Sequence, residues 1–375
     1  TLKVDAIRHN SATSDAITTA ADGTCTAKIT GRTGGGGLSN RNLIINGAMQ
    51  IAQRGTSSTA TGHGTVDRFA VYHSTDDAPT QSQSDVGLSD LPFTEQGITK
   101  CLKVTNGNQS GAGNAEYVEI NYKCEAQDIR NSGWNYQSSS SFITLSYYVR
   151  SSVAQTFTAW ITNRDGTRKN FVWSYALSAN TWTKITKVIP GDSGLTINND
   201  NGAAIELWFQ MFYGTNYSQA SPPGNNTGGW VNHDNQTVET NDTSWYLTND
   251  ATFEITGVQL EVGNHATSFE HRSVADELAR CQRYYEETYV MTDAGNSYVR
   301  VPVLYKVEKR AVGTPVSYAK RPDGVGTGAA NKAYQADGER TASCNYSWTG
   351  GTMLFVSGYS ANTDCFSNIR VNAEL

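Results

Sequence analysis

The sequence predicts a mainly β protein with an N-terminal extended arm, a jelly-roll β-sandwich, one short helix and a small C-terminal β domain. Many short segments alternate apolar and polar residues with a period of two, as strands do. Polar turn residues separate these segments, and only the stretch near residue 280 has the three-and-four spacing of a helix. Charged residues make up 17% of the chain against a usual share of about 25%, which suits polar rather than charged turns.

Residues 1–40 form the predicted arm. Three stretches, 1–8, 16–19 and 24–29, are short strand candidates, and Asp22-Gly23 is a turn signal between the last two. Four consecutive glycines at 34–37 end the segment as a flexible hinge. Because so short a segment is unable to bury a core of its own, we expect it to order by pairing with another structure.

Residues 41–272 form the predicted jelly-roll sandwich. Its strand candidates include 43–51, 142–149, 157–161, 204–213 and 253–262. Several of them separate into two faces, and a series of short strands with polar turns is typical of a jelly roll or a related sandwich. Residues 213–243 read as a long loop rich in Asn, Gly and Thr, and loops of this length are usually functional or disordered.

Residues 273–288 connect the sandwich to the C-terminal part, and 273–287 are predicted to be helical. Ser273 is a suitable N-cap, and Asp276 and Glu277 fall in the first turn, where the helix dipole favours acids. The expected apolar face consists of Leu278, Cys281, Tyr284 and Tyr285. Residues 289–375 return to strand patterns and form the predicted C-terminal β domain, either a receptor-facing tip or a spacer.

The charge and hydropathy of the chain argue against several classes of partner. With a net charge of -6 and a pI near 5.6, the chain lacks the clustered Lys and Arg on which nucleic-acid binding depends. No apolar stretch approaches the roughly 18 residues that suggest a membrane span, and no signal-peptide pattern is found. We therefore expect no nucleic-acid partner, no membrane insertion and no export through a signal peptide.

The cysteines are too far apart in sequence for a CxxC pair or a metal-binding spacing. They stand at positions 25, 101, 124, 281, 344 and 365. We expect reduced, mostly buried thiols, while one pairing, Cys344 with Cys365 or Cys101 with Cys124, stays open. No metal site and no cofactor is predicted.

Two motifs in the predicted sandwich resemble a known family. The sequence NLIINGAMQIAQRG at 42–55, followed by VDRF at 66–69, resembles the opening of a sandwich domain common in bacteriophage tail-fibre and appendage proteins. ITGVQLEVG at 255–263, TSFEHR at 267–272 and the helix that follows resemble the close of the same domain. The opening also resembles the first strand of many jelly-roll carbohydrate-binding modules. Ala48 stands where related domains often carry an acid, which makes a calcium site of that kind doubtful.

The resemblance implies a phage virion protein. Residues 1–30 resemble N-terminal segments of marine phage fibres, which implies that the arm docks on other virion proteins of the tail or an adaptor. The docking candidates are the apolar positions of the arm: Leu2, Val4, Ile7, Ile17 and Ile29. RVNAEL at 370–375 is similar to the last strand of such fibres, and the family implies a homotrimer that contacts a host-surface glycan or protein.

No convergent set of catalytic residues is found, and we expect no enzymatic activity. The six histidines are scattered, and no HExxH, GxSxG or P-loop pattern occurs. Asp76 and Asp77 are adjacent and would point to opposite faces of a strand, whereas glycoside cleavage needs two acids that face one sugar. His233 and Asp234 fall in the long loop, where a polar surface explains them better than hydrolysis does.

Sugar binding needs exposed aromatic faces with amides nearby, and aromatic residues in Asn-rich stretches are the candidates. The candidate glycan-binding residues are Trp134, Tyr136, Tyr213, Tyr217 and Trp230. Five other tryptophans sit in strand patterns and are expected in the core: Trp160, Trp173, Trp182, Trp208 and Trp245. Two other functions stay open, a purely structural virion adaptor and a polysaccharide depolymerase, although the β-helix repeats usual in depolymerases are not found.

Overall fold

The computed structural model describes residues 40–222, 224, 226–236, 238–240, 242–292, 298–336, 338–358 and 364–375, together with three short N-terminal strands. These strands, β1 (Ala6–Ile7), β2 (Ile17–Thr19) and β3 (Cys25–Ala27), form an antiparallel sheet in which Ile7 lies opposite Ile17. Leu2, Val4 and Ile29 lie outside the described residues. The docking role of the arm therefore stays a prediction.

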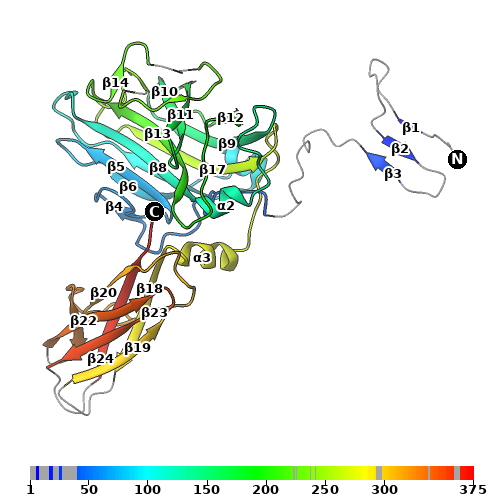
Figure 1. Ribbon diagram of the computed structural model, residues 1–375. Coiled ribbons are helices and arrows are strands. Elements are labelled where there is room, and N and C mark those ends of the chain that lie inside the picture. The colour runs from blue at the N-terminus through cyan, green and yellow to red at the C-terminus, as the bar shows by residue number, and fades with distance from the viewer. Residues whose placement is uncertain are drawn as a thin grey trace.

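The main body is a β-sandwich of two six-stranded sheets, in agreement with the predicted fold class (Figure 1). The first sheet, named the cleft sheet below, has the order β15 (Val231–Asn232), β11 (Lys169–Leu177), β10 (Gln155–Asn163), β13 (Ala203–Tyr213), β8 (Tyr117–Glu125) and β5 (Phe69–Ser74). The back sheet has the order β12 (Thr183–Pro190), β9 (Phe142–Ser151), β17 (Thr252–Val262), β7 (Lys100–Thr105), β6 (Thr80–Asp85) and β4 (Ser57–Ser58). The chain passes repeatedly from one sheet to the other, as in a jelly roll.

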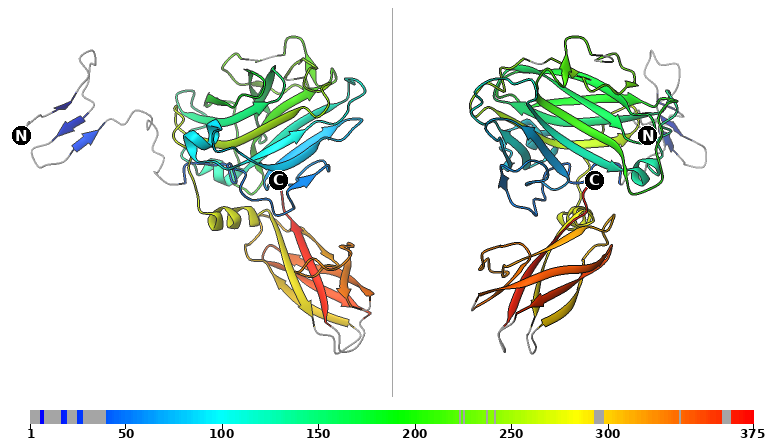
Figure 2. Two further views of the ribbon diagram at one scale, coloured as in Figure 1. Left: turned by 180° about the vertical axis from the view of Figure 1, so that it is seen from behind. Right: turned by 60° about the vertical axis from the view of Figure 1, so that its left-hand side comes forward.

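The period-two pattern of the cleft sheet decides which side chains enter the core between the sheets. In β10, Phe157, Ala159 and Ile161 are fully buried in that core. The alternate positions of the same strand, Trp160 among them, therefore point to the outer face of the sheet. Figure 2 shows the two sheets lying face to face, with the outer face of the cleft sheet turned away from the core.

The opening segment 43–51, predicted as a strand, is an irregular turn instead. Asn46 and Met49 have positive φ values of 62° and 58°, which break an extended strand. A Cβ atom at Gly47 would lie 2.1 Å from the carbonyl oxygen of Val258, so this turn packs directly on β17. Tight packing of the backbone, rather than strand pairing, explains the Asn-Gly pair here.

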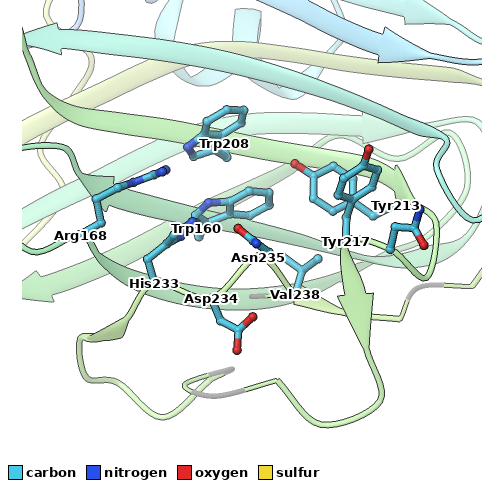
Figure 3. Close-up of a pocket in the computed structure, with 10 residues that line it drawn as sticks. Trp160, Arg168, Trp208, Tyr213, Tyr217, His233, Asp234, Asn235 and Val238 are labelled. Atoms are coloured by element: carbon cyan, nitrogen blue, oxygen red, sulfur yellow. The ribbon is translucent and has the colours of Figure 1, made fainter.

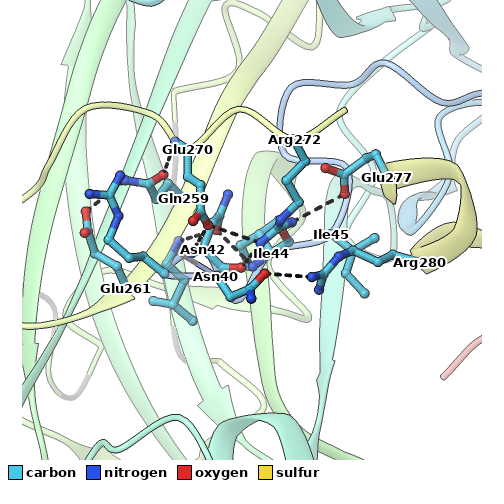
Figure 4. Close-up of polar contacts among 12 residues, drawn as sticks. Asn40, Asn42, Ile44, Ile45, Gln259, Glu261, Glu270, Arg272, Glu277 and Arg280 are labelled. Carbon is cyan, nitrogen blue, oxygen red and sulfur yellow. Dashed lines mark hydrogen bonds and ion pairs between the residues drawn. The ribbon is translucent and has the colours of Figure 1, made fainter. Parts of the chain in front are cut away.

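The opening and closing motifs meet in one polar cluster beside β17 (Figure 4). Asn42 Oδ1 accepts from the backbone amides of Ile44 and Leu260 at 2.9 and 3.1 Å, and the amide of Asn42 donates to Glu270 Oε2 at 2.8 Å. Arg272 donates to the carbonyl oxygens of Asn42 and Ile44. The two motifs are therefore parts of one structural closure, in which buried backbone groups find partners.

Three helices occur among the described residues, where the sequence predicted one. The helix α3 (Val274–Gln282) begins as expected, because the amide of Asp276 donates to Ser273 Oγ at 3.1 Å. It ends earlier than predicted, since β18 already starts at Tyr285. The unexpected helices, α1 (Leu91–Gln96) and α2 (Ala126–Arg130), are too short to produce a visible helical period.

The C-terminal domain is a separate seven-stranded sheet around its own small core (Figure 1). Its strands are β18 (Tyr285–Thr292), β19 (Tyr298–Leu304), β20 (Thr314–Tyr318), β21 (Lys332–Gln335), β22 (Gly338–Trp348), β23 (Gly351–Ser357) and β24 (Cys365–Asn372). A fully buried ion pair joins Lys309 Nζ to Glu286 Oε2 at 2.7 Å. Burial lowers the pKa of Lys309 although the Glu286 carboxylate opposes the change.

Residues after β24 return to the sandwich and join the two domains. The carboxylate of Glu374 forms ion pairs with Arg68 and Arg54, and with His63 Nε2 at 3.7 Å when that ring is protonated. The guanidinium carbon of Arg68 also lies 3.4 Å from the ring centroid of Tyr284. This buried cluster, named the Glu374 junction below, fixes the C-terminal domain to the segment that precedes β5.

Candidate functional site

A cleft of about 430 Å³ opens on the outer face of the cleft sheet, below the long loop between β13 and β17 (Figure 3). Its lining residues are Trp160, Arg168, Trp208, Tyr213, Asn216, Tyr217, His233, Asp234, Asn235 and Val238. The tryptophans come from central strands of the sheet, and most of the other residues come from the long loop. A rigid floor with loop walls is the usual construction of a ligand-binding cleft.

Two tryptophans from neighbouring strands form the floor of the cleft. Trp160 on β10 and Trp208 on β13 are directly opposite each other in the antiparallel register. Their rings are nearly parallel, with 9° between the planes and 5.6 Å between centroids. Trp208 is half-buried and its indole Nε1 has no hydrogen-bond partner among the described residues. The floor is thus an apolar surface, and the indole nitrogen of Trp208 is itself buried.

A β-bulge brings Tyr213 onto the same face as the tryptophans. Strict alternation from Trp208 would turn Tyr213 toward the core. The pairing of β13 with β8 shifts between Gln210 and Phe212, so that Phe212 enters the core and Tyr213 points outward. The ring of Tyr213 lies 5.7 Å from that of Trp160, and Tyr217 packs edge-on against it at 5.8 Å.

The opposite wall consists of loop residues with polar side chains. Val238 is fully buried against Trp160 and Val172, which fixes this part of the loop to the sheet. The amide nitrogen of Asn170 lies 3.0 Å from His233 Nδ1. Burial, together with the charges of Arg168 and Arg164, lowers the pKa of His233, so the ring is neutral at neutral pH. Asn216 and Asn235 add side-chain amides along the rim.

Glu119 lies beside the floor on β8 and is nearly inaccessible to solvent. Its carboxyl accepts a hydrogen bond from the hydroxyl of Tyr213. Burial and the nearby charge of Glu206 raise the pKa of Glu119 to about 8, against the opposing effect of the Tyr213 hydrogen bond. The group is therefore mainly protonated at neutral pH, and it supports Tyr213 without placing a charge under the cleft.

Only two of the five predicted glycan-binding aromatics, Tyr213 and Tyr217, line this cleft. Trp134 is 3% exposed and belongs to the sandwich core, where Tyr136 packs against it. Trp230 is also in the core, and its indole donates to the carbonyl oxygen of Pro190 at 2.7 Å. Asn and Gly residues flank Trp134, Tyr136 and Trp230 in the sequence and suggested that these rings are exposed. In the structure the three rings cover the edges of the core.

Trp160 and Trp208 were expected in the core. Trp160 is indeed buried, at 6% exposed, but in a small cluster with Val172 and Val238 on the outer face of the cleft sheet. Trp208 is half-buried, so the prediction was wrong for that residue. Trp173 and Trp245 do lie in the main core, and Trp182 is buried against Tyr148 outside it. A signal was present in the sequence, because Trp208 has Glu206 and Gln210 two positions away on either side. Residues two apart share a face, so the tryptophan belongs to the polar, outward face.

The other motifs considered for chemistry have structural roles or lie apart. Asp76 and Asp77 accept hydrogen bonds from the amides of Ser110 and Asn108, as acids in a surface turn do. Over the described part of the chain, no group of three His, Cys, Asp or Glu residues could hold a metal ion. The five cysteines described there are free thiols. No helix in that part is long and apolar enough to cross a membrane.

Comparisons with known proteins find distant structural similarity alone. No family model and no curated protein sequence matches the chain. The enzymatically active domain of tailspike protein 4 of bacteriophage CBA120 is 9% identical, with a TM-score of 0.32, over 59% of this chain and 21% of that one. The N-terminal cellulose-binding domain of Cellulomonas fimi β-1,4-glucanase C is 12% identical, with a TM-score of 0.28, over 58% of this chain and 99% of that one.

A third similar structure is Clostridium thermocellum endo-1,4-β-D-xylanase 10B, whose CBM22-1 and GH10 modules are complexed with xylohexaose. It is 12% identical, with a TM-score of 0.28, over 60% of this chain and 31% of that one. The match thus spans about a fifth of the tailspike structure and about a third of the xylanase structure. At TM-scores this low, these likenesses carry no argument about function, which has to come from the cleft itself.

Proposed function

We propose that this protein binds glycan in the cleft floored by Trp160 and Trp208, without turnover. The observation that carries the proposal is the pair of nearly parallel indole rings at the base of a concave surface, of which Trp160 is buried and Trp208 is half-buried. Flat aromatic rings stack on the C–H faces of pyranose sugars, and side-chain amides pair with sugar hydroxyls. Tyr213, Asn216 and Asn235 supply such polar groups around the floor.

The acids nearest the floor support binding rather than hydrolysis. Glu206 is 1% exposed, and its carboxylate pairs with Arg164 at 3.1 Å and with Lys123 at 3.7 Å. Glu119 is 5% exposed and is held by Tyr213. Glycoside cleavage requires two carboxyl groups that flank the scissile bond. Among the described lining residues Asp234 is the one acid, and neither Glu206 nor Glu119 lines the cleft.

We further propose that the protein is a tail fibre or another appendage of a phage virion that contacts the host surface. The motifs at 42–69 and 255–285 support this assignment through their resemblance to such proteins, and the arm at 1–40 would dock on the particle. A homotrimer would present several clefts at once, so that weak contacts add by raised effective concentration. Sedimentation of the full chain as a monomer would contradict the trimer.

The glycan proposal is tested by replacing the half-buried floor residue. We expect Trp208→Ala to weaken binding to host-envelope polysaccharide by about tenfold or more, because central aromatic residues dominate such interfaces. Trp348→Ala removes a tryptophan that is 40% exposed on the C-terminal domain and is the matched control. Binding is measured by calorimetry, and reducing ends are measured in parallel.

The outcomes separate the open functions. Loss of binding in Trp208→Ala alone, with no new reducing ends, supports adsorption through the cleft. Equal binding of both variants would contradict the site, and release of new reducing ends would show a depolymerase. A protein that binds no host glycan yet is found on assembled particles would be a structural adaptor.

A further inference from the structure

Arg168 places a positive charge in the cleft. Its guanidinium lines the cleft beside Trp160 and Trp208 (Figure 3). Within the described residues, no carboxylate lies within ion-pair distance of this guanidinium, and its Nε is buried without a hydrogen-bond partner. Arg164 differs in this respect, because it pairs with Glu206 at 3.1 Å.

The surroundings of Arg168 leave its charge uncompensated. Burial and the positive charge of Arg164 lower the pKa of Arg168, and the more distant Glu206 opposes them only in part. Glu206 is already shared between Arg164 and Lys123. The carboxyl of Glu119 is mainly protonated at neutral pH and adds no negative charge. Asp234 lines the same cleft, but within the described residues it forms no ion pair with Arg168. An anion in the cleft would therefore find an unpaired guanidinium despite the chain's net charge of -6.

His233 offers a second donor in the cleft. Asn170 Oδ1 accepts the hydroxyl of Thr162 at 2.8 Å, which orients its amide nitrogen toward His233 Nδ1. That contact makes Nδ1 the acceptor and assigns the proton of the neutral ring to Nε2. The cleft thus combines a guanidinium with an imidazole N–H, two groups that suit the oxygens of an anion.

We propose that the cleft is selective for acidic glycans, with a carboxylate or sulfate of the sugar bound by Arg168 while its ring lies on Trp160 and Trp208. This inference rests on the proposed function and adds the chemical class of the ligand. The planar guanidinium of arginine suits both anions, because it can donate two parallel hydrogen bonds to the two oxygens of a carboxylate or to two oxygens of a sulfate.

The test compares acidic sugars with their neutral counterparts. Oligogalacturonate is compared with its methyl ester, and a sulfated galactan oligosaccharide with its desulfated form, each by calorimetry on the full chain. We expect the acidic member of at least one pair to bind about tenfold more tightly or better. The pair that shows the preference identifies carboxylate or sulfate as the recognised group.

The variant Arg168→Gln removes the charge and keeps a polar side chain. We expect it to abolish the preference, so that the acidic and the neutral member of each pair bind with equal affinity. Arg321→Gln, on an exposed arginine paired with Asp323 in the C-terminal domain, is the matched control. Thermal melting confirms that both variants are folded.

The results distinguish this inference from the function on which it rests. Binding of neutral and acidic members with equal affinity would overturn the acidic selectivity and leave glycan binding intact. An acidic preference that survives Arg168→Gln would overturn the role of Arg168. Absence of binding to every member of both pairs, and to host polysaccharide, would overturn both proposals.

Discussion

At the scale of single residues, burial decides how charge is distributed around the cleft. Arg168 has no carboxylate within ion-pair distance in the described part of the chain, and Glu119 next to the floor is held in its protonated form. Burial shifts both groups toward their neutral forms. It neutralises Glu119 but leaves Arg168 charged, because the ordinary pKa of arginine lies far above neutral pH.

Glu119 makes the stability of the sandwich depend on pH. Its pKa is about 8 in the folded protein and near 4.5 when exposed, so the folded state binds more protons over this range. The free energy of unfolding should therefore fall as the pH rises from about 5 to about 8. We expect Glu119→Gln, which keeps an acceptor for Tyr213, to be more stable than the wild type by roughly 2–4 kcal/mol at pH 9.

Urea unfolding at pH 5 and pH 9 measures this difference. Asp250→Asn, at an exposed acid with a left-handed backbone that Asn tolerates, is the control and should leave the pH dependence unchanged. An equal difference in the free energy of unfolding between Glu119→Gln and the wild type at both pH values would contradict the raised pKa of Glu119.

At the scale of elements, the segments that close the sandwich are stabilised by polar contacts. The cluster around Asn42 joins the opening turn, β17 and the segment before α3 (Figure 4). The helix itself packs Cys281 against Ile45 and Ile51 of the opening turn. Because both ends of the domain meet here, the start of α3 influences the whole sandwich.

The N-cap of α3 gives a quantitative prediction for this element. Ser273→Ala removes the acceptor for the amide of Asp276, which should lower the free energy of unfolding by about 1 kcal/mol. Ser139→Ala, at an exposed serine outside any helix, should change it by less than about 0.5 kcal/mol. Chemical denaturation measures both, and equal values for the two variants would show that the cap contributes nothing.

At the scale of the whole molecule, the Glu374 junction decides how rigidly the two domains are joined. Further contacts support it, because Arg283 donates to both carboxylate oxygens of Glu125 at 2.8 and 2.9 Å. Arg310 also donates to the carbonyl oxygen of Asn201 at 2.7 Å. The C-terminal domain is thus fixed to the sandwich through charged groups, of which Glu125 is buried and Arg283 is partly exposed.

Replacement of Glu374 should uncouple the domains. Burial alone would raise the pKa of Glu374, but the charges of His63, Arg68 and Arg54 lower it to about 2. Its contribution to stability is therefore full above pH 4.5 and is lost as the pH falls toward 2. We expect Glu374→Gln to destabilise the protein by about 3 kcal/mol at pH 7, because Arg68 is left buried without its partner.

Differential scanning calorimetry distinguishes the domains. The variant should show two separate transitions or a lowered first transition at pH 7. Its stability difference from the wild type should shrink as the pH falls from 4.5 toward 2. A stability difference that stays constant over this pH range would mean that the carboxylate is not held ionised by this cluster.

The sequence by itself determined the mainly β fold and the helix α3 with its Ser273 cap, because alternation and capping are local properties of the chain. The tertiary structure alone decided which aromatic residues face a ligand. A bulge in β13 turned Tyr213 outward, while Trp134 and Trp230 were drawn into the core. Which rings are covered depends on contacts between residues far apart in the chain, and no local pattern specifies them.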